Sequence, residues 1–590
     1  MFDYKESWKQ KIGSALKKLD ESISQDQVVA EIPPNPEMGD LGFPMFGFAK
    51  ILRKGPPQIA QMIAAELPGS FAVGPYVNVK LNRAETAQNI LSEFFVLKSG
   101  SPIGCPGTLA GSKIMVEYSS PNTNKPLHLG HLRNDVLGES ISRILAACGA
   151  EVRRVCIIND RGIHICKSML AYKEHGCGKT PESEGIKCDH FVGDWYVAFN
   201  NTLKEEAEAL GKSGLDKKNA EAQAPVLQRA QELLRRWEAG DAETVELWKK
   251  MNSWAVEGWK ETYARTGVRF DQYYFESQTY LLGKDEILKG LEKGIFYREE
   301  DGSVQADLTA EKLDKKVLLR KDGTSIYITQ DIGTAIYRHT DWPFDRLVYV
   351  VGSEQQYHFK VLFTLLRKLG FDWAKDLCHL SYGMVNLPEG KMKSREGTVV
   401  DADDLIDSLK EMALEEIHSK EREEAVGDTE TAAEKIAIGA LHYFLLQVSP
   451  SKDMLFDPKE SLSFNGNTGP YLQYMGARIS SLLRKAPKEA SQAENPRFEL
   501  LTHDAEWDLI KTLSAYNDSV AAAAEGMDPS LVAAYLYNLA KAFSRFYHDC
   551  PILSAEESDL VIARLALCRA VLAVLTDALG LSCIPFLEVM

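Results

Sequence analysis

Two histidines in a short loop are the residues of this chain best suited to phosphate chemistry. The segment SSPNTNKPLHLGHLRND, residues 119–135, contains His128, Gly130 and His131. An apolar, strand-like run at residues 114–116 precedes it and a helix-like run follows it. A helix N-terminus offers unpaired N–H groups and a positive dipole end, so this junction suits a nucleotide phosphate. These residues alone leave open the alternative of an ordinary helix start that happens to carry two histidines.

A second segment supports the nucleotide interpretation. GKMKSREGTVVD, residues 390–401, places Lys391, Lys393 and Arg395 in a loop bracketed by glycines. A basic loop alone could be an ordinary solvated turn. Both segments in this order, about 260 residues apart, rarely arise by accident.

Together the two segments resemble the paired ATP signatures of class I aminoacyl-tRNA synthetases, a His-x-Gly-His motif and a mobile Lys-Met-Ser-Lys-Ser loop. The resemblance implies that His128 and His131 donate to phosphate oxygens while the α-phosphate is attacked. Gly130 would let the nucleotide base approach the backbone, because a Cβ would obstruct it. The resemblance also assigns Lys391 and Lys393 to catalysis, and assigns to the ATP site Leu129, Gly352, His358, Met384, Ser394 and Arg395.

Longer matches narrow the resemblance to the arginyl-tRNA synthetases and extend it over nearly the whole chain. VEYSSPNTNKPLHLGHLR matches that family far beyond the short nucleotide signature. The other matching segments are IINDRG (157–162), HFVGDWYV (190–197), GVRFD (267–271), YITQD (327–331), VVGSEQQYHF (350–359) and NTGPYLQYMGARI (467–479).

The resemblance implies a pocket for arginine. A guanidinium is planar, charged and rich in donors, so it needs carboxylates and planar acceptors. Glu117, Tyr327 and Asp331 would hold it, and a helical turn would put Tyr327 and Asp331 on one face. For an isolated Asp, a surface or capping role would be the better interpretation, but here each carboxylate lies within a matched motif. The amino acid's own amino and carboxylate groups would bind Ser120, Asn122 and Gln355.

The implied reaction is attack of the arginine carboxylate on the α-phosphorus of ATP, with pyrophosphate leaving. Such catalysis is mostly positioning and charge stabilisation, so no nucleophilic side chain is needed. Mg²⁺ would be bound through ATP oxygens, and the sequence indicates no protein ligand for it.

Lys125 is a candidate for a missing loop lysine. The fourth position of the Lys-Met-Ser-Lys-Ser loop holds Ser394 here. Family members that lack that lysine often carry another just before the histidine signature, and Lys125 lies three residues ahead of His128. Lys393 is the rival, and an exposed loop lysine is the simpler alternative.

Composition predicts a soluble globular protein that binds nucleic acid only locally. The net charge of −16 argues against nonspecific coating of nucleic acid, but a local basic track could hold a tRNA. The basic residues of such a track would be explained equally well as the solvated faces of helices. No signal peptide, membrane-length apolar run or Cys-x-x-Cys pair is present, so we expect a reduced, cytoplasmic protein. We also expect it to be a monomer. The candidate tracks are Lys9, Lys11, Lys17 and Lys18, then Arg478, Arg484 and Lys485.

Three short His/Cys pairs raise the question of zinc. Their ligand types suit zinc, but their one-residue spacing differs from the usual two-residue knuckle. We therefore expect no structural zinc. The pairs are His164 with Cys166, His175 with Cys177, and Cys188 with His190.

The chain divides into four expected regions. Residues 1–108 would form an N-terminal α/β domain that contacts the tRNA elbow through Asn78, by resemblance. A Rossmann-like parallel sheet would occupy residues 109–375, interrupted by a helical insertion at about 195–265. The mobile loop and a connection would fill residues 376–435, and helices without strand signal would follow to residue 590.

By resemblance, residues 436–590 form the anticodon-binding domain. Tyr471, Tyr474 and Tyr547 could stack on unpaired bases or pack in the core. The chain ends in PFLEVM, which departs from the family's usual ending.

The family's reaction predicts three partners: ATP, arginine and the tRNA for arginine, with activation that depends on bound tRNA. The alternatives are another class I synthetase, such as one for glutamine or cysteine, and a tRNA-binding regulator without catalysis. Intact His128, His131 and Lys391 argue against the regulator.

Overall fold

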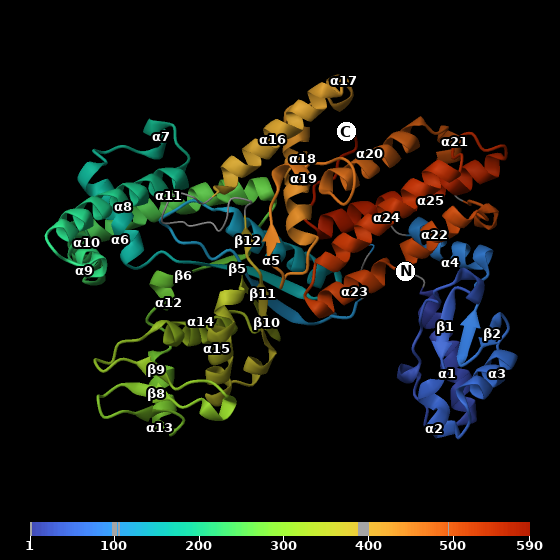
Figure 1. Ribbon diagram of the computed structural model, residues 1–590, viewed down its shortest axis with the longest axis horizontal. Coiled ribbons are helices and arrows are strands. Elements are labelled where there is room, and N and C mark those ends of the chain that lie inside the picture. The colour runs from blue at the N-terminus through green and yellow to red at the C-terminus, as the bar shows by residue number, and fades with distance from the viewer. Residues whose placement is uncertain (1–2, 97–102, 104–106, 387–399, 492, 494) are drawn as a thin grey trace.

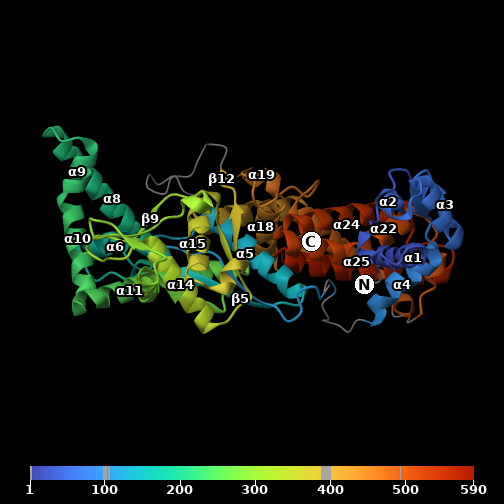
Figure 2. The ribbon, with the colours of Figure 1, turned by 90° about the horizontal axis from the view of Figure 1, so that it is seen from below.

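The computed structural model describes residues 3–96, 103, 107–386, 400–491, 493 and 495–590. Figure 1 shows an elongated molecule with a helical lobe at one end and a small N-terminal domain at the other. A central sheet and a large helical domain lie between them, and the view from below keeps this order (Figure 2). The expected fold class is therefore confirmed: a Rossmann-like sheet with a helical insertion, an N-terminal α/β domain and a C-terminal helical domain.

The central sheet has five parallel strands in the spatial order β11-β10-β4-β5-β6. The chain runs from β4 through α5 (Leu129–Ala147) to β5, and much later lays β10 on the other side of β4. The strand order therefore reverses between β4 and β10, and open parallel sheets bind ligands at the carboxyl edge of such a switch. Glu117 and Gly352 end these two strands and lie at that edge. The bounds are β4 Lys113–Glu117, β5 Glu151–Ile158, β6 Gln272–Phe275, β10 Arg346–Gly352 and β11 Leu377–Tyr382.

Strand β4 is apolar because both faces of the sheet are covered. Ile114 and Val116 enter the core shared with α5, while Met115 enters a second core with helices α14 and α15. Alternate side chains of a strand point to opposite faces, so this double burial accounts for the unbroken apolar run. The helices on the second face and beside it are α12 Glu276–Thr279, α13 Lys284–Glu292, α14 Tyr327–Asp341 and α15 Gln356–Lys368.

A helical insertion between β5 and β6 has an apolar core of its own. It begins with α6, well before the charged stretch from which the sequence predicted it. Tyr172 of α6 and Phe191 of α8 contact each other and Trp254 within that core, which explains the earlier start. The bounds are α6 Ile163–His175, α7 Pro181–Glu184, α8 Cys188–Lys212, α9 Lys217–Gln223, α10 Pro225–Glu238 and α11 Ala242–Thr266.

Two small strand pairings were not anticipated. An antiparallel sheet comprises β7 Tyr297–Arg298, β8 Val304–Ala306 and β9 Lys316–Leu319. Strand β12 (Val385–Asn386) pairs in parallel with β13 (Met454–Leu455). The expectation of no strand after residue 436 was therefore wrong, because a two-residue strand is set by its distant partner rather than by its own pattern.

The N-terminal domain combines an antiparallel sheet, ordered β1-β3-β2, with helices. It rests on the C-terminal helical domain: Arg83 pairs with Asp504 at 2.9 Å, and the Trp507 indole donates to Asp40 at 3.1 Å. Its elements are α1 Tyr4–Leu19, β1 Leu41–Pro44, α2 Ala49–Leu52, α3 Pro56–Glu66, β2 Ser70–Val73, β3 Tyr76–Val79 and α4 Arg83–Val96.

The C-terminal part is helical and packs on the far side of α5. Ser140 and Arg143 of α5 donate to the carbonyls of Leu581 and Gly580, which tie the two domains together. In the described part of the chain, no helix has both the length and the apolar character that a membrane span requires. The helices are α16 Ala402–Ser419, α17 Glu423–Val426, α18 Thr429–Leu446, α19 Pro458–Ser461, α20 Gly469–Lys485, α21 Lys488–Ser491, α22 Asp504–Ser514, α23 Tyr516–Gly526, α24 Ser530–Asp549 and α25 Ser558–Leu581.

Candidate active site

The two signature histidines form the N-terminal cap of α5. The His128 ring accepts the Gly130 N–H through Nδ1 at 3.1 Å, and the His131 ring accepts the His128 N–H through Nδ1, also at 3.1 Å. Each Nδ1 is therefore an acceptor, and the proton of each neutral ring must be on Nε2. A Cβ on Gly130 would come within 3.0 Å of the His128 ring, so the glycine makes room for this cap.

Both rings are neutral at physiological pH. Burial, followed by the positive charge of Lys125, lowers the pKa of His128 to about 4. Burial also lowers the pKa of His131 well below its usual value, with electrostatic contributions from His128 and Lys125. The site therefore presents two uncharged N–H donors beside the unpaired N–H groups of a helix N-terminus.

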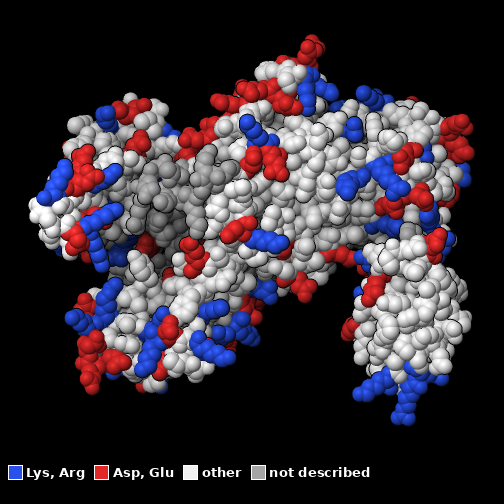
Figure 3. Space-filling model, viewed as in Figure 1, with Lys and Arg blue, Asp and Glu red and all other residues white. Residues whose placement is uncertain are grey.

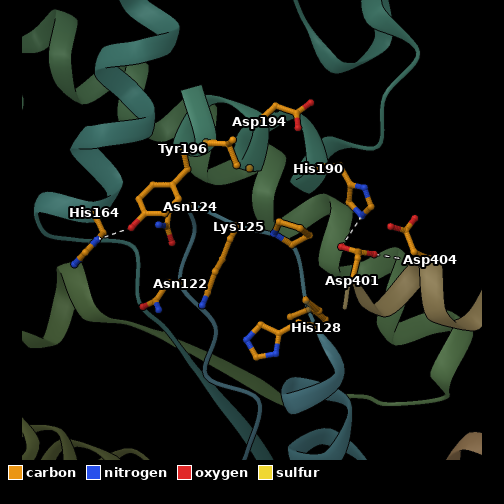
Figure 4. Close-up of a pocket in the computed structure, with 14 residues that line it drawn as sticks. Asn122, Asn124, Lys125, His128, His164, His190, Asp194, Tyr196, Asp401 and Asp404 are labelled. Atoms are coloured by element: carbon orange, nitrogen blue, oxygen red, sulfur yellow. Dashed lines mark hydrogen bonds and ion pairs between the residues drawn. The ribbon is translucent and has the colours of Figure 1, made fainter. Parts of the chain in front are cut away.

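Lys125 precedes this cap in the loop from β4. Its side chain extends into a cavity of about 390 Å³ (Figure 4). Burial lowers the pKa of its ammonium, and no carboxylate in the described part of the chain pairs with it. A half-buried cation without a counter-charge attracts an anion such as a triphosphate. The same cavity is lined by Asn122, Asn124, His128, His164, His190 and Tyr196.

The turn between β4 and this loop is strained. Ser119 and Ser120 both have positive φ, at 68° and 52°, which side chains other than glycine rarely adopt. The Asn159 amide holds the Ser120 carbonyl at 2.9 Å, and Asn159 also bridges to Asn122. Asn122 is exposed and lines the cavity, while Ser120 is half-buried.

Glu117 already has a charged partner inside the protein. Its carboxylate pairs with the guanidinium of Arg338, and both side chains are buried. Burial raises the pKa of Glu117, although Arg338 opposes that rise. Arg338 comes from α14 and stacks over the Tyr274 ring at 5.0 Å. A substrate guanidinium at Glu117 would have to share this carboxylate.

Asp331, which the sequence assigned to arginine binding, contacts a residue that the sequence assigned to ATP binding. Its carboxylate lies 2.7 Å from Nε2 of His358, which was expected to bind ATP. Tyr327 and Asp331 lie one turn apart on α14, as their spacing predicts, and Tyr327 is 76% exposed. Gln355 immediately precedes α15 and is exposed, while Gly352 ends β10 beside it.

Glu276 is a candidate that sequence reasoning missed. It begins α12 directly after β6, at the carboxyl edge of the sheet. Burial raises its pKa to about 7, and the negative charges of Asp160 and Asp331 add to the rise, while Arg161 opposes it. An acid that immediately follows a strand of a parallel sheet was the signal that could have identified it.

Asn78 and Met384 are not among the described residues that line this cavity. Asn78 of β3 is 3% exposed and donates its amide to the Met38 carbonyl at 2.8 Å. Met384 is exposed, and its N–H donates to Asp453. The loop residues Lys391, Lys393, Ser394 and Arg395 lie outside the described residues.

The group nearest to a metal site differs from the His/Cys pairs that the sequence suggested. Within the described ranges, the group of potential ligands whose atoms lie close together is Asp189, His190 and Asp403. Cys166 is buried and Cys177 is exposed, and both are free thiols.

Comparison with known proteins identifies the family. The family model described as tRNA synthetases class I (R), catalytic domain, matches residues 104–457. The chain belongs to the arginyl-tRNA synthetases of class I. An arginyl tRNA synthetase N terminal domain matches residues 6–81, and a DALR anticodon binding domain matches residues 472–590.

Named relatives agree with this assignment over the full length. The chain is 59% identical to an arginine–tRNA ligase of Treponema denticola across 100% of both chains, and 49% identical to one of Bacteroides thetaiotaomicron across 92% of both. The arginyl-tRNA synthetase structure from Thermus thermophilus covers 100% of both chains with 26% identity and a TM-score of 0.82. The Plasmodium falciparum arginyl-tRNA synthetase shares the fold, with 20% identity and a TM-score of 0.76 across 99% of both chains.

Proposed function

We propose that this class I arginyl-tRNA synthetase forms arginyl-adenylate from arginine and ATP beside Lys125, His128 and His131, and then transfers arginine to its tRNA. The observation that carries the proposal is the unpaired, half-buried Lys125 ammonium next to two imidazoles with Nε2–H donors. All three groups gather at the N-terminus of α5, where a triphosphate is favoured.

The residues of this loop stabilise negative charge on the phosphates and do not act as acids or bases. As the arginine carboxylate attacks the α-phosphorus, negative charge builds on the phosphate oxygens and the leaving pyrophosphate. The neutral imidazoles donate to those oxygens without losing a proton, and Lys125 supplies a positive charge. Mg²⁺ bound through the phosphates would add charge neutralisation, and the carboxylates of Asp194 and Asp404 line the same cavity as oxygen donors.

Arginine is proposed to bind between α12 and α14. Because Arg338 pairs with Glu117, we assign the negative charge for the substrate guanidinium to Glu276 and to Asp331, whose carboxylate also contacts His358. The exposed Tyr327 ring can pack on the guanidinium plane. The amino acid end is assigned to Ser120, Asn122 and Gln355 near the loop. A pocket built on such hydrogen bonds rejects lysine by about 10⁴-fold, because bound lysine would leave the acceptors of the pocket unpaired.

A groove on the C-terminal domain is the proposed anticodon site. This cavity of about 620 Å³ is lined by Arg422, Arg484 and Lys485. In it the Arg478 guanidinium lies over two lining tyrosines, at 5.2 Å from the Tyr474 ring and 4.8 Å from the Tyr547 ring. Cations beside aromatic rings suit unpaired bases and their phosphates. Val589 and Met590 also line the groove, so these two residues would contact the tRNA.

The N-terminal domain offers a second basic surface. Figure 3 shows Lys and Arg gathered at its far tip, over α2. The exposed cations of that element and its end are Lys50, Arg53 and Lys54. By contrast, Lys9 and Lys18 pair with Glu6 and Glu66. We assign the tip to the tRNA elbow, with the buried Asn78 in a supporting role.

The test is ATP–pyrophosphate exchange with each amino acid, with and without tRNA. The proposal expects exchange with arginine, none with lysine above about 10⁻⁴ of that rate, and strong dependence on tRNA. Comparable exchange with lysine would refute the pocket, and full exchange without tRNA would refute the coupling. The proposed monomer is checked by light scattering.

A further inference from the structure

A short segment after the second signature fixes the backbone of the first. Residues 400–402 run antiparallel to residues 127–129, with a bridge between Asp401 and His128. Two backbone hydrogen bonds of 3.0 and 3.1 Å flank this bridge. The direction of the His128 ring therefore depends on where residues 400–402 are held.

An ionic cluster from the helical insertion holds that segment. His190, in the first turn of α8, places Nε2 at 3.4 Å from Asp401 and 3.6 Å from Asp403. Asp403 also pairs with Lys187 at 2.7 Å and with Arg265 of α11 at 3.0 Å. Figure 4 shows His190 beside Asp401 at the edge of the cavity that contains Lys125 and His128.

The insertion also touches the signature loop directly. A Cβ on Gly193 of α8 would lie 2.8 Å from the Pro126 ring, so helix and loop are already in contact. The buried Trp259 indole of α11 donates to the Lys125 carbonyl at 3.2 Å. Both long helices of the insertion, α8 and α11, therefore contact the loop that we assign to ATP binding.

The cluster is not suited to a metal ion, although Asp189, His190 and Asp403 lie close together. Lys187 pairs with both Asp189 and Asp403, and Arg265 takes the other oxygen of Asp403. These cations already neutralise the carboxylates that an ion would need.

We propose that His190 is a positioning residue for adenylate formation: through Asp401 and Asp403 it holds residues 400–403 against residues 127–129, and so directs His128 and Lys125 at ATP. The inference rests on the proposed role of the signature loop. Interaction with Asp401 and Asp403 raises the pKa of His190 to about 10 against the opposing effect of burial, so the ring stays charged and ion-paired with these carboxylates at neutral pH.

The test is a double-mutant cycle with His190→Gln and Asp401→Asn, measured by pyrophosphate exchange in the full-length enzyme with tRNA. Asp401 caps α16, and asparagine caps equally well, so this variant removes the charge while keeping the cap. Each single variant is expected to lower kcat about 10-fold with the KM for arginine within about 2-fold, because the loop misaligns while the arginine pocket stays intact. The double variant should lower kcat no further than the single variants.

Matched variants separate positioning from folding. His190→Lys keeps a positive charge and should recover part of kcat, while His175→Gln, at the exposed end of α6, should leave kcat unchanged. Hydrogen exchange in peptides covering residues 127–131 and 400–404 should rise in His190→Gln. Additive losses in the cycle, or a loss that follows a lower Tm and is not recovered by lysine, would overturn the proposal.

Failure of this inference can be told from failure of the proposed site. If Lys125→Ala lowers kcat and His190→Gln does not, the positioning role is wrong and the site stands. If neither variant lowers kcat, the charge-supplying role proposed for Lys125 fails as well.

Discussion

At the scale of single residues, the site depends on charged and polar groups that are shielded from water yet lack internal partners. Most buried charged side chains that the structure describes are paired, as Glu117 is with Arg338. Lys125 differs, since no carboxylate among the described residues pairs with it. Holding such a cation costs stability, and a triphosphate that binds there recovers it.

Lys125→Ala is expected to lower kcat for activation by about 10²-fold, as the loss of a transition-state charge should. Ser394→Lys in the same chain should restore part of the rate, because it returns a lysine to the second signature. Lys212→Ala, exposed at the end of α8, is the matched control. A near-normal kcat in Lys125→Ala would mean that Lys393 or Arg395 supplies the charge.

Glu276 should give arginine binding a pH dependence. Its pKa is raised to about 7, so it is protonated below that pH and negative above it. kcat/KM for arginine should therefore fall as the pH decreases through about 7, since a neutral acid attracts a guanidinium less. Glu276→Gln should lower kcat/KM at pH 8 and flatten the profile, while the exposed Glu257→Gln should keep the wild-type profile. If Glu276→Gln left the pH profile of kcat/KM unchanged, Glu276 would not belong to the arginine pocket.

At the scale of elements, local patterns predicted more than distant pairings did. The β4–loop–α5 junction and the α14 turn that carries Tyr327 and Asp331 both follow from spacing within a few residues. The Glu117–Arg338 pair and the His358–Asp331 contact join separate elements, and only the packing of α14 and α15 on the sheet creates them. Glu276 was missed for the same reason: its burial depends on neighbours from other elements.

The contact of α8 with the signature loop provides a test at this scale. Gly193→Ala would push its Cβ against Pro126 at 2.8 Å, so helix or loop must shift, and kcat should fall about 10-fold. Gly211→Ala, in the same helix with open space around it, should keep kcat and stabilise the helix by up to about 1 kcal/mol. If both variants keep full activity, the contact does not position the loop. Pyrophosphate exchange and thermal unfolding measure the two effects.

At the scale of the whole molecule, the two proposed tRNA surfaces lie away from the cavity. The N-terminal domain docks on the helical domain through Arg83 and Trp507 and not on the central sheet (Figure 1). The helical domain in turn holds α5 through Ser140 and Arg143. A tRNA gripped at both surfaces would thus act on the element that carries the signature histidines, which gives tRNA-dependent activation a physical route.

Arg478→Ala tests whether the groove binds tRNA and whether it does so without affecting the arginine pocket. Removing this cation from between Tyr474 and Tyr547 should raise the Kd for tRNA about 10-fold, through lost stacking and one lost phosphate contact. The slope of log Kd against log salt should fall by about 1, as expected for one cation that contacts phosphate. At saturating tRNA the KM for arginine should not change. Lys459→Ala, exposed on α19, removes the same charge outside the groove and should alter neither value. If Arg478→Ala changed the KM for arginine but left the Kd for tRNA intact, the groove would not be a tRNA site.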